Sequence, residues 1–259
     1  MEAKKIVKFL KENFNIGSKY DIAFIMGSGL SGGVPDFSDE IIVDYEQTPM
    51  PKSKVEGFKG QFIFGKLNGK NVVKLTRYHY YETGERSLVN LPFEILSLLG
   101  VETVVMATST GAVNKKLKAG DLLLIKDHIN LAGNNPLINS EKIEFIDLSN
   151  AYDKSLRDSV LSIAKKNKIK LKEGIHMQVS GPSYETKAEV YMARKLGADT
   201  ISMSTAFDTI CARKHNIKVL SFAFVSNASG ETDLKHEDVL KNAQQNSKKI
   251  KTLLNNLFS

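Results

Sequence analysis

The chain has 259 residues, of which 42% are hydrophobic and 25% are charged, a composition that excludes extensive disorder. The formal net charge is +7, but the lysines are spread through helix-like segments, so we expect no nucleic-acid partner. No apolar run reaches the roughly 18 residues of a membrane span, and we expect no membrane partner. The N-terminus has no signal-peptide pattern, and the single Cys211 cannot form an internal disulfide, so we expect a cytoplasmic protein.

A glycine-rich turn follows the first predicted strand. Residues 2–14 have the apolar spacing of an amphipathic helix, and 21–26 form an apolar strand that leads into Gly27-Ser28-Gly29-Leu30-Ser31-Gly32. Glycines let several backbone N–H groups approach one anion, and this sequence also matches the G-x-G-x-x-G dinucleotide pattern. The turn therefore predicts either an anion site or a dinucleotide site, unless it is a tight turn with no ligand.

The next segment excludes the dinucleotide interpretation. A dinucleotide unit needs a crossover helix of a dozen or more residues between its two strands. Only residues 33–40, which include a glycine and a proline, separate the turn from the next apolar run at 41–43. This stretch is too short and too broken for that helix, so the anion interpretation remains.

The rest of the chain alternates predicted strands and helices, without an internal repeat or a domain linker. Residues 131–150 are polar and irregular, which indicates a long loop that is a lid or a subunit contact. The other predicted elements are a hairpin of strands 62–64 and 72–75 around Asn68-Gly69, helices at 92–99, 154–167, 186–196, 206–215 and 236–257, and strands at 101–106, 122–125, 175–179, 200–203 and 219–225. The pattern predicts an α/β fold with one core, so we expect a single domain over 1–259.

Small or reactive residues follow many of these strands. They are Ser28, Arg77 with His79, Ser109, Glu185, Ser204 and Asn227. Ligands of open α/β sheets bind beyond the carboxyl ends of the strands, so we expect these residues to converge on one site. Glycine amides, serines, a histidine and an arginine suit phosphate, while a carboxylate and a carboxamide can bind the edge of a heterocycle. The combination indicates transfer between a nucleoside and phosphate.

Other chemistries fit less well. The glycine turn lacks the lysine of a P-loop, and the sequence around Ser28 is not the G-x-S-x-G pattern of serine hydrolases. The five histidines show no metal-ligand spacing, so we expect no metal site; they are His79, His128, His176, His215 and His236.

Five motifs, in the same order, resemble those of the trimeric purine nucleoside phosphorylases, the family that also contains methylthioadenosine phosphorylase. They are Gly27-Ser28-Gly29-Leu30, the stretch from Gly120-Asp121 to Asp127-His128-Ile129-Asn130-Leu131, Asn135-Pro136-Leu137, Gly181-Pro182-Ser183-Tyr184-Glu185-Thr186, and the stretch from Leu196-Gly197-Ala198-Asp199 to Met203-Ser204-Thr205. The resemblance covers residues 20–245. It implies a twisted mixed β-sheet flanked by helices, a homotrimer, and phosphorolysis of purine nucleosides, with inorganic phosphate as co-substrate and without a metal or organic cofactor.

The resemblance also implies a role for each site residue. Phosphate would be held by Ser28, Arg77, His79 and Ser204 with the backbone at Ser109, ribose by Tyr81, Met203 and His236, and the base by Tyr184, Glu185 and Asn227. His79, Glu185 and Asn227 would be the catalytic residues, and Glu82 would orient the Arg77–His79 pair. Each assignment has a structural alternative. Arg77 could be in a surface ion pair, Glu185 a first-turn helix carboxylate, His236 only the start of a helix, Met203 packing, and Tyr184 core.

The sequence departs from the family pattern at several places. Phe58 stands where a phosphate-binding histidine is common, and Thr108-Ser109-Thr110-Gly111 replaces an Asn-Ala-Ala-Gly run. Ala228 stands where a lysine is frequent, and 138–145 has no clear counterpart of the aromatic that a neighbouring subunit lends to the site. Asn227 favours 6-oxopurines such as inosine and guanosine, because the methylthioadenosine branch carries an aspartate there. The alternatives are a methylthioadenosine or adenosine phosphorylase and a non-catalytic nucleoside-binding protein.

Overall fold

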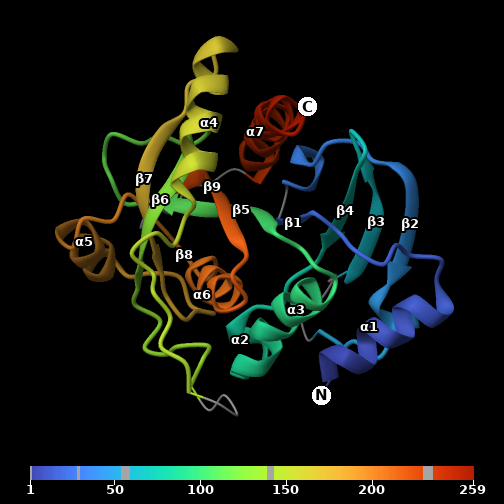
Figure 1. Cartoon of the computed structure of the whole chain (residues 1–259). Coiled ribbons are helices and arrows are strands. Elements are labelled where there is room, and N and C mark those ends of the chain that lie inside the picture. The colour runs from blue at the N-terminus through green and yellow to red at the C-terminus, as the bar shows by residue number, and fades with distance from the viewer. Residues whose placement is uncertain (1, 28–29, 54–58, 139–142, 230–235) are drawn as a thin grey trace.

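The computed structural model describes residues 2–27, 30–53, 59–138, 143–229 and 236–259, without the side chains of 236–245. Within these residues, nine strands join in one sheet that is flanked by helices (Figure 1). The strands are β1 (Ile22–Met26), β2 (Ser38–Asp44), β3 (Gln61–Leu67), β4 (Lys70–Leu75), β5 (Thr103–Ala112), β6 (Leu122–Asn130), β7 (Lys172–Gln178), β8 (Thr200–Ser202) and β9 (Lys218–Ala228). The helices are α1 (Glu2–Asn13), α2 (Tyr80–Thr83), α3 (Arg86–Leu98), α4 (Lys154–Lys166), α5 (Lys187–Lys195), α6 (Ala206–Lys214) and α7 (His236–Leu257), with 3-10 turns η1 (Ser31–Gly33) and η2 (Tyr45–Gln47).

Part of the sheet closes on itself. The strand order is β2-β3-β4-β1-β5-β8-β7-β6-β9, and β9 also pairs with β5. The last five strands therefore form a closed ring, from which β1, β4, β3 and β2 extend as an open sheet. Parallel pairs such as β1–β5 and β5–β9 mix with antiparallel pairs such as β2–β3 and β6–β9. The predicted mixed sheet is confirmed, and the ring is an addition that the sequence does not indicate.

Helices cover both faces of the sheet (Figure 1), because each face presents apolar side chains. On one face, α1, α3 and α6 contribute buried residues such as Leu10 and Phe207. On the other face, α4 and α7 contribute residues such as Val160 and Leu254. No helix among the described residues is long and apolar enough to cross a membrane.

The described residues of the first part of the chain form no dinucleotide-binding unit. After the glycine turn the described backbone makes only the short turn η1, and β2 then pairs antiparallel with β3, away from β1. The predicted hairpin is confirmed, since β3 and β4 pair antiparallel around Asn68 and Gly69. Both turn residues have positive φ, 50° and 80°, which suits an Asn-Gly pair.

Several predicted elements were too short. The helix predicted from Pro92 begins at Arg86, with Pro92 inside α3, because residues before the proline also bury apolar side chains, Val89 and Leu91 among them. Strand β5 continues to Ala112, and β6 and β9 also extend past their apolar runs. Polar residues continue these strands because pairing between β5 and β9, and between β6 and β7, satisfies their backbone groups.

Candidate active site

Arg77 lies directly beyond β4, and its guanidinium is buried beside the glycine turn. The side chain is only 3% exposed, and Nη1 pairs with the carboxylate of Asp208 in α6. Nη2 donates to the Ala107 carbonyl at 3.2 Å, and the Gly27 N–H donates to the same oxygen at 2.7 Å. A Cβ on Gly27 would lie 3.1 Å from that oxygen and 3.5 Å from Nη2, so the close approach favours glycine. The alternative of a surface ion pair is wrong, because the pair is buried.

His79 is held by the carboxylate of Glu82. Glu82 Oε1 accepts the His79 backbone N–H at 2.6 Å and lies 3.3 Å from Nδ1, while the Ser53 hydroxyl donates to the other oxygen. Burial opposes the charge of Glu82, but these hydrogen bonds outweigh burial and lower its pKa. Glu82 therefore orients His79, as predicted, but among the described contacts it is Asp208, and not Glu82, that orients Arg77.

The His79 ring also stacks on Tyr81, the predicted ribose residue. The two ring centroids are 5.0 Å apart and the planes differ by 15°. Burial raises the pKa of Tyr81, so its hydroxyl stays protonated near neutral pH. The stacked pair places an imidazole and a phenol side by side, where the predicted phosphate and ribose would meet.

Ser204 and Thr205 form a strained turn between β8 and α6. Ser204 Oγ lies 3.1 Å from Thr108 Oγ1 of β5. Thr205 has φ 89° and ψ −45°, a conformation that costs a β-branched residue on the order of 1–3 kcal/mol. Asp208 Oδ2 accepts the Thr205 N–H at 3.0 Å, so one carboxylate contacts both this turn and Arg77.

Asn227 lies near the end of β9, opposite Gly111 of β5. Its Oδ1 accepts the Ser226 hydroxyl at 2.7 Å, and its Nδ2 donates to the Ala228 carbonyl at 3.1 Å. The amide is half-buried and fixed from both sides. One N–H of Nδ2 has capacity left for a ligand.

Glu185 lies just before α5 and is half-buried, and burial raises the pKa of its carboxyl group. The N-cap of α5 is Thr186, and the carboxylate that completes its capping box belongs to Glu189. The alternative of Glu185 as the first-turn carboxylate of this helix is therefore wrong.

The loop before α5 also places Tyr184 and Met203. Tyr184 is 86% exposed, so its alternative as a core residue is wrong. Gly181 has φ 66°, and a Cβ there would lie 2.4 Å from the sulfur of Met203. Met203, which directly follows β8, thus packs against this loop, in agreement with the alternative that it is a packing residue.

Three predicted residues lie wholly or partly outside the described structure. Ser28 and Phe58 are among the residues left out, and for His236 only the backbone is described, as the first residue of α7. Ser109 is half-buried within β5 and not at its end, because it pairs with Phe224 of β9.

The second half of β5 connects these groups. Within residues 107–111, it contacts Arg77 through Ala107, Ser204 through Thr108, and the Asn227 backbone through Gly111. Three of the predicted residues, Arg77, Ser204 and Asn227, therefore meet along one strand although they come from separate parts of the chain. This arrangement can hold an anion at one end and a polar heterocycle at the other.

Asp208 is a site residue that the sequence interpretation missed. Its signal was the pattern Thr205-x-x-Asp208, a capping box at the start of a helix. That pattern predicts a helix start but not the contact with Arg77, which is distant in the chain.

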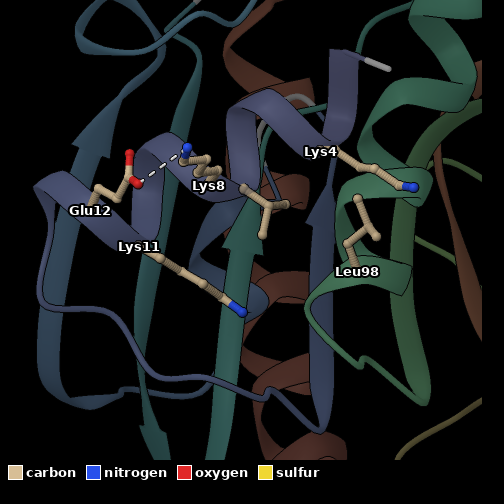
Figure 2. Close-up of a pocket in the computed structure, with 6 residues that line it drawn as sticks. Lys4, Lys8, Lys11, Glu12 and Leu98 are labelled. Atoms are coloured by element: carbon tan, nitrogen blue, oxygen red, sulfur yellow. Dashed lines mark ion pairs between the residues drawn. The ribbon is translucent and has the colours of Figure 1, made fainter.

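A surface cavity of about 390 Å³ lies elsewhere, between α1 and α3. Figure 2 shows its lining residues, which include the ion pair Lys8–Glu12 with 3.6 Å between Nζ and Oε1. None of its residues belongs to the predicted site, and exposed lysines on one helix are typical of a solvated face. Among the described residues, no group of three or more His, Cys, Asp or Glu side chains could hold a metal ion.

The sequence also matches known proteins over nearly its whole length. Residues 21–259 match the profile of the phosphorylase superfamily. The chain is 36% identical over 247 residues to purine nucleoside phosphorylase 1 of Bacillus subtilis, covering 92% of this chain and 90% of that protein. The chain belongs to the purine nucleoside phosphorylase family.

Solved structures of purine nucleoside phosphorylases share the fold. Isoform 2 of the Schistosoma mansoni enzyme, in complex with cytosine and ribose-1-phosphate, superposes with a TM-score of 0.91 at 32% identity, covering 99% of this chain and 95% of that one. The Schistosoma mansoni enzyme in complex with inosine gives a TM-score of 0.89 at 32% identity, with the same coverage. The α/β fold expected from the motifs is thus that of the purine nucleoside phosphorylase family.

Proposed function

We propose that the protein catalyses the phosphorolysis of purine nucleosides, with 6-oxopurine nucleosides such as inosine and guanosine as its preferred substrates. The ribosyl group passes from the purine to inorganic phosphate, giving the free base and ribose 1-phosphate. The observation that carries this proposal is the meeting of Arg77, Ser204 and Asn227 along residues 107–111 of β5. The family membership supports the same reaction, as do the complexes of solved relatives with ribose-1-phosphate and with inosine.

Phosphate binds at the end of the site formed by Arg77, His79 and Ser204, with the backbone at Ser109 and the hydroxyl of Ser28. A buried guanidinium is a strong partner for an anion because little water screens it. Arg77 is already paired with Asp208, so phosphate meets a guanidinium whose position is fixed before binding. Because the side chain is already fixed, binding phosphate costs less conformational entropy.

Ribose lies between the two ends, against Tyr81 and Met203, with His236 near its 5′-hydroxyl. The glycosidic bond breaks ahead of phosphate attack, so positive charge develops at the anomeric carbon. The bound phosphate stabilises that charge and then attacks the carbon. Electrons from the broken bond flow into the purine.

The base lies against Tyr184, with Glu185 and Asn227 at its edge. A 6-oxopurine carries an N–H at N1, which the Glu185 carboxylate can accept, whereas adenine has an acceptor at the same position. Asn227 donates its remaining N–H to the purine and stabilises it as it leaves. The Glu185 contact favours inosine and guanosine over adenosine and methylthioadenosine. The Asn227 N–H favours them as well where it reaches the 6-position, because a 6-oxo group accepts and a 6-amino group donates.

A neighbouring subunit completes the site in a homotrimer. Phe145 is 98% exposed, and it is the aromatic residue of the 131–150 segment. A phenyl ring in water gains free energy when a partner covers it. We therefore propose Phe145 as the aromatic lent to the adjacent pocket, although the resemblance alone gives no clear counterpart within 138–145. We also propose that the chain acts as a single domain over 1–259, that it works in the cytoplasm, and that it needs no metal or organic cofactor.

The test is the release of hypoxanthine from inosine, measured with and without phosphate and in parallel with adenosine and methylthioadenosine. The proposal expects release that requires phosphate and prefers inosine. Release without phosphate would indicate a hydrolase, and preference for the amino purines would indicate the methylthioadenosine type. Binding without turnover would indicate a nucleoside-binding protein.

A further inference from the structure

His176 is a buried histidine that the proposed mechanism does not use. It lies in β7 with a fully buried side chain, and both ring nitrogens have polar partners. Nδ1 is 3.0 Å from Thr200 Oγ1, while Nε2 is 3.1 Å from the Ser204 carbonyl oxygen and 3.1 Å from Ser202 Oγ. The imidazole therefore links β7 to the segment 200–204, which ends at the proposed phosphate serine.

The partners determine the tautomer of His176. The Ser204 carbonyl can only accept a hydrogen bond, so Nε2 carries the proton and donates it. Nδ1 is then the acceptor, and the Thr200 hydroxyl donates to it. Burial lowers the pKa of His176 to about 3, so the ring stays neutral throughout the physiological pH range. A neutral ring can hold the carbonyl without adding a positive charge near the guanidinium of Arg77.

Ser204 is restrained at each of its polar groups. Its carbonyl oxygen accepts from His176, its backbone N–H donates to Ser202 Oγ at 3.3 Å, and its hydroxyl contacts Thr108 Oγ1 at 3.1 Å. The next residue, Thr205, has the strained φ of 89°. Such a conformation persists only where its surroundings hold it in place. The hydrogen bond from His176 is one of the contacts that supply this restraint.

We propose that His176 is a positioning residue for Ser204, whose carbonyl it holds so that the serine hydroxyl faces bound phosphate. This inference rests on the proposed function, since it takes Ser204 as a phosphate ligand. Thr200 acts through His176 by hydrogen bonding to its Nδ1 and so holding the ring in place. The histidine itself does not touch the reacting atoms.

The test compares His176→Phe, which has no N–H donor, with His176→Gln, whose carboxamide N–H can reach the Ser204 carbonyl. The affinity for inorganic phosphate is measured by calorimetry without nucleoside, and KM is measured separately for phosphate and inosine. His176→Phe is expected to raise the phosphate Kd and KM by about tenfold or more, with the inosine KM within about twofold. His176→Gln is expected to restore phosphate binding to within about threefold.

The matched control is His128→Gln in the neighbouring strand β6. His128 contacts the Tyr152 hydroxyl at 3.0 Å, and its replacement should leave the phosphate Kd unchanged. If His176→Phe does not fold, Thr200→Val carries the test, because it removes only the hydroxyl that holds Nδ1 of the ring. A phosphate Kd raised by about twofold or more is then expected.

Unchanged phosphate affinity in folded His176→Phe, or in Thr200→Val where that variant replaces it, would overturn the inference. Equal increases of the phosphate and inosine KM, or a failure of His176→Gln to restore phosphate binding, would also overturn it. Calorimetry distinguishes a failure of this inference from a failure of the proposed function. A wild-type protein that binds phosphate but does not release hypoxanthine contradicts the function alone, whereas a wild-type protein that binds no phosphate contradicts both.

Discussion

Replacing Asp208 with asparagine removes the carboxylate that neutralises Arg77. Both side chains are 3% exposed, so the guanidinium would remain buried without its counter-ion. Removing one partner of a buried ion pair costs about 3–5 kcal/mol of stability. A protein of this size loses about 2–4 °C of Tm per kcal/mol, so we expect Asp208→Asn to lower Tm by roughly 6–20 °C.

Phosphate should reverse part of this loss. A ligand at 100 times its Kd stabilises the folded state by about 2.7 kcal/mol, and in Asp208→Asn phosphate also supplies the missing negative charge. We therefore expect phosphate to raise the Tm of this variant by more than it raises the wild-type Tm. Thermal unfolding at one protein concentration, in phosphate and in chloride of equal ionic strength, measures the difference.

The control is Asp158→Asn, which removes a carboxylate that is 55% exposed and paired with Lys154. Exposed pairs contribute about 0–1 kcal/mol, so this variant should keep the wild-type Tm and the wild-type response to phosphate. The reasoning is refuted if Asp208→Asn unfolds at the wild-type temperature. It is also refuted if phosphate raises both Tm values equally, because Arg77 would then not face the anion.

Three further results are expected. Asn227→Asp should lower kcat for inosine by ~10²-fold, because a donor to the leaving purine is lost, and should shift the activity ratio toward adenosine; unchanged selectivity in parallel assays would contradict its role. Burial raises the pKa of Glu185, so its carboxylate is protonated at a higher pH than an ordinary glutamate, and kcat/KM for inosine should fall as pH decreases through that pKa. A pH profile of Glu185→Gln should lack this acid limb, and an identical limb would exclude Glu185 as its source. Phe145→Ala should raise the inosine KM by about tenfold without changing subunit folding, and an unchanged KM in a confirmed trimer would show that Phe145 is not lent to the neighbouring pocket.

Local signals in the sequence predicted most of the fold. The Asn68-Gly69 turn was predictable because both residues accept the positive φ that a tight hairpin needs. The start of α3 was not predictable. Pro92 is a local signal for a helix boundary, whereas the burial that extends the helix before it depends on distant contacts. The ring closure between β5 and β9 was also hidden, since apolar runs do not specify which strands pair.

The site residues also divide into those that local sequence signals indicate and those that only the fold reveals. Arg77, Ser204 and Asn227 were visible as polar residues placed around strand ends, and they do meet along β5. Asp208 and His176 were not recognised, because each acts through partners that only the fold brings near. A capping pattern and an isolated histidine contain no information about those partners.

The central claim is transfer of a ribosyl group to phosphate, and its most direct test is the identity of the sugar product from inosine. We expect incubation of the wild-type protein with inosine and phosphate to yield hypoxanthine and ribose 1-phosphate in equal amounts, and no product without phosphate. Free ribose, or hypoxanthine released at the same rate without phosphate, would contradict the account.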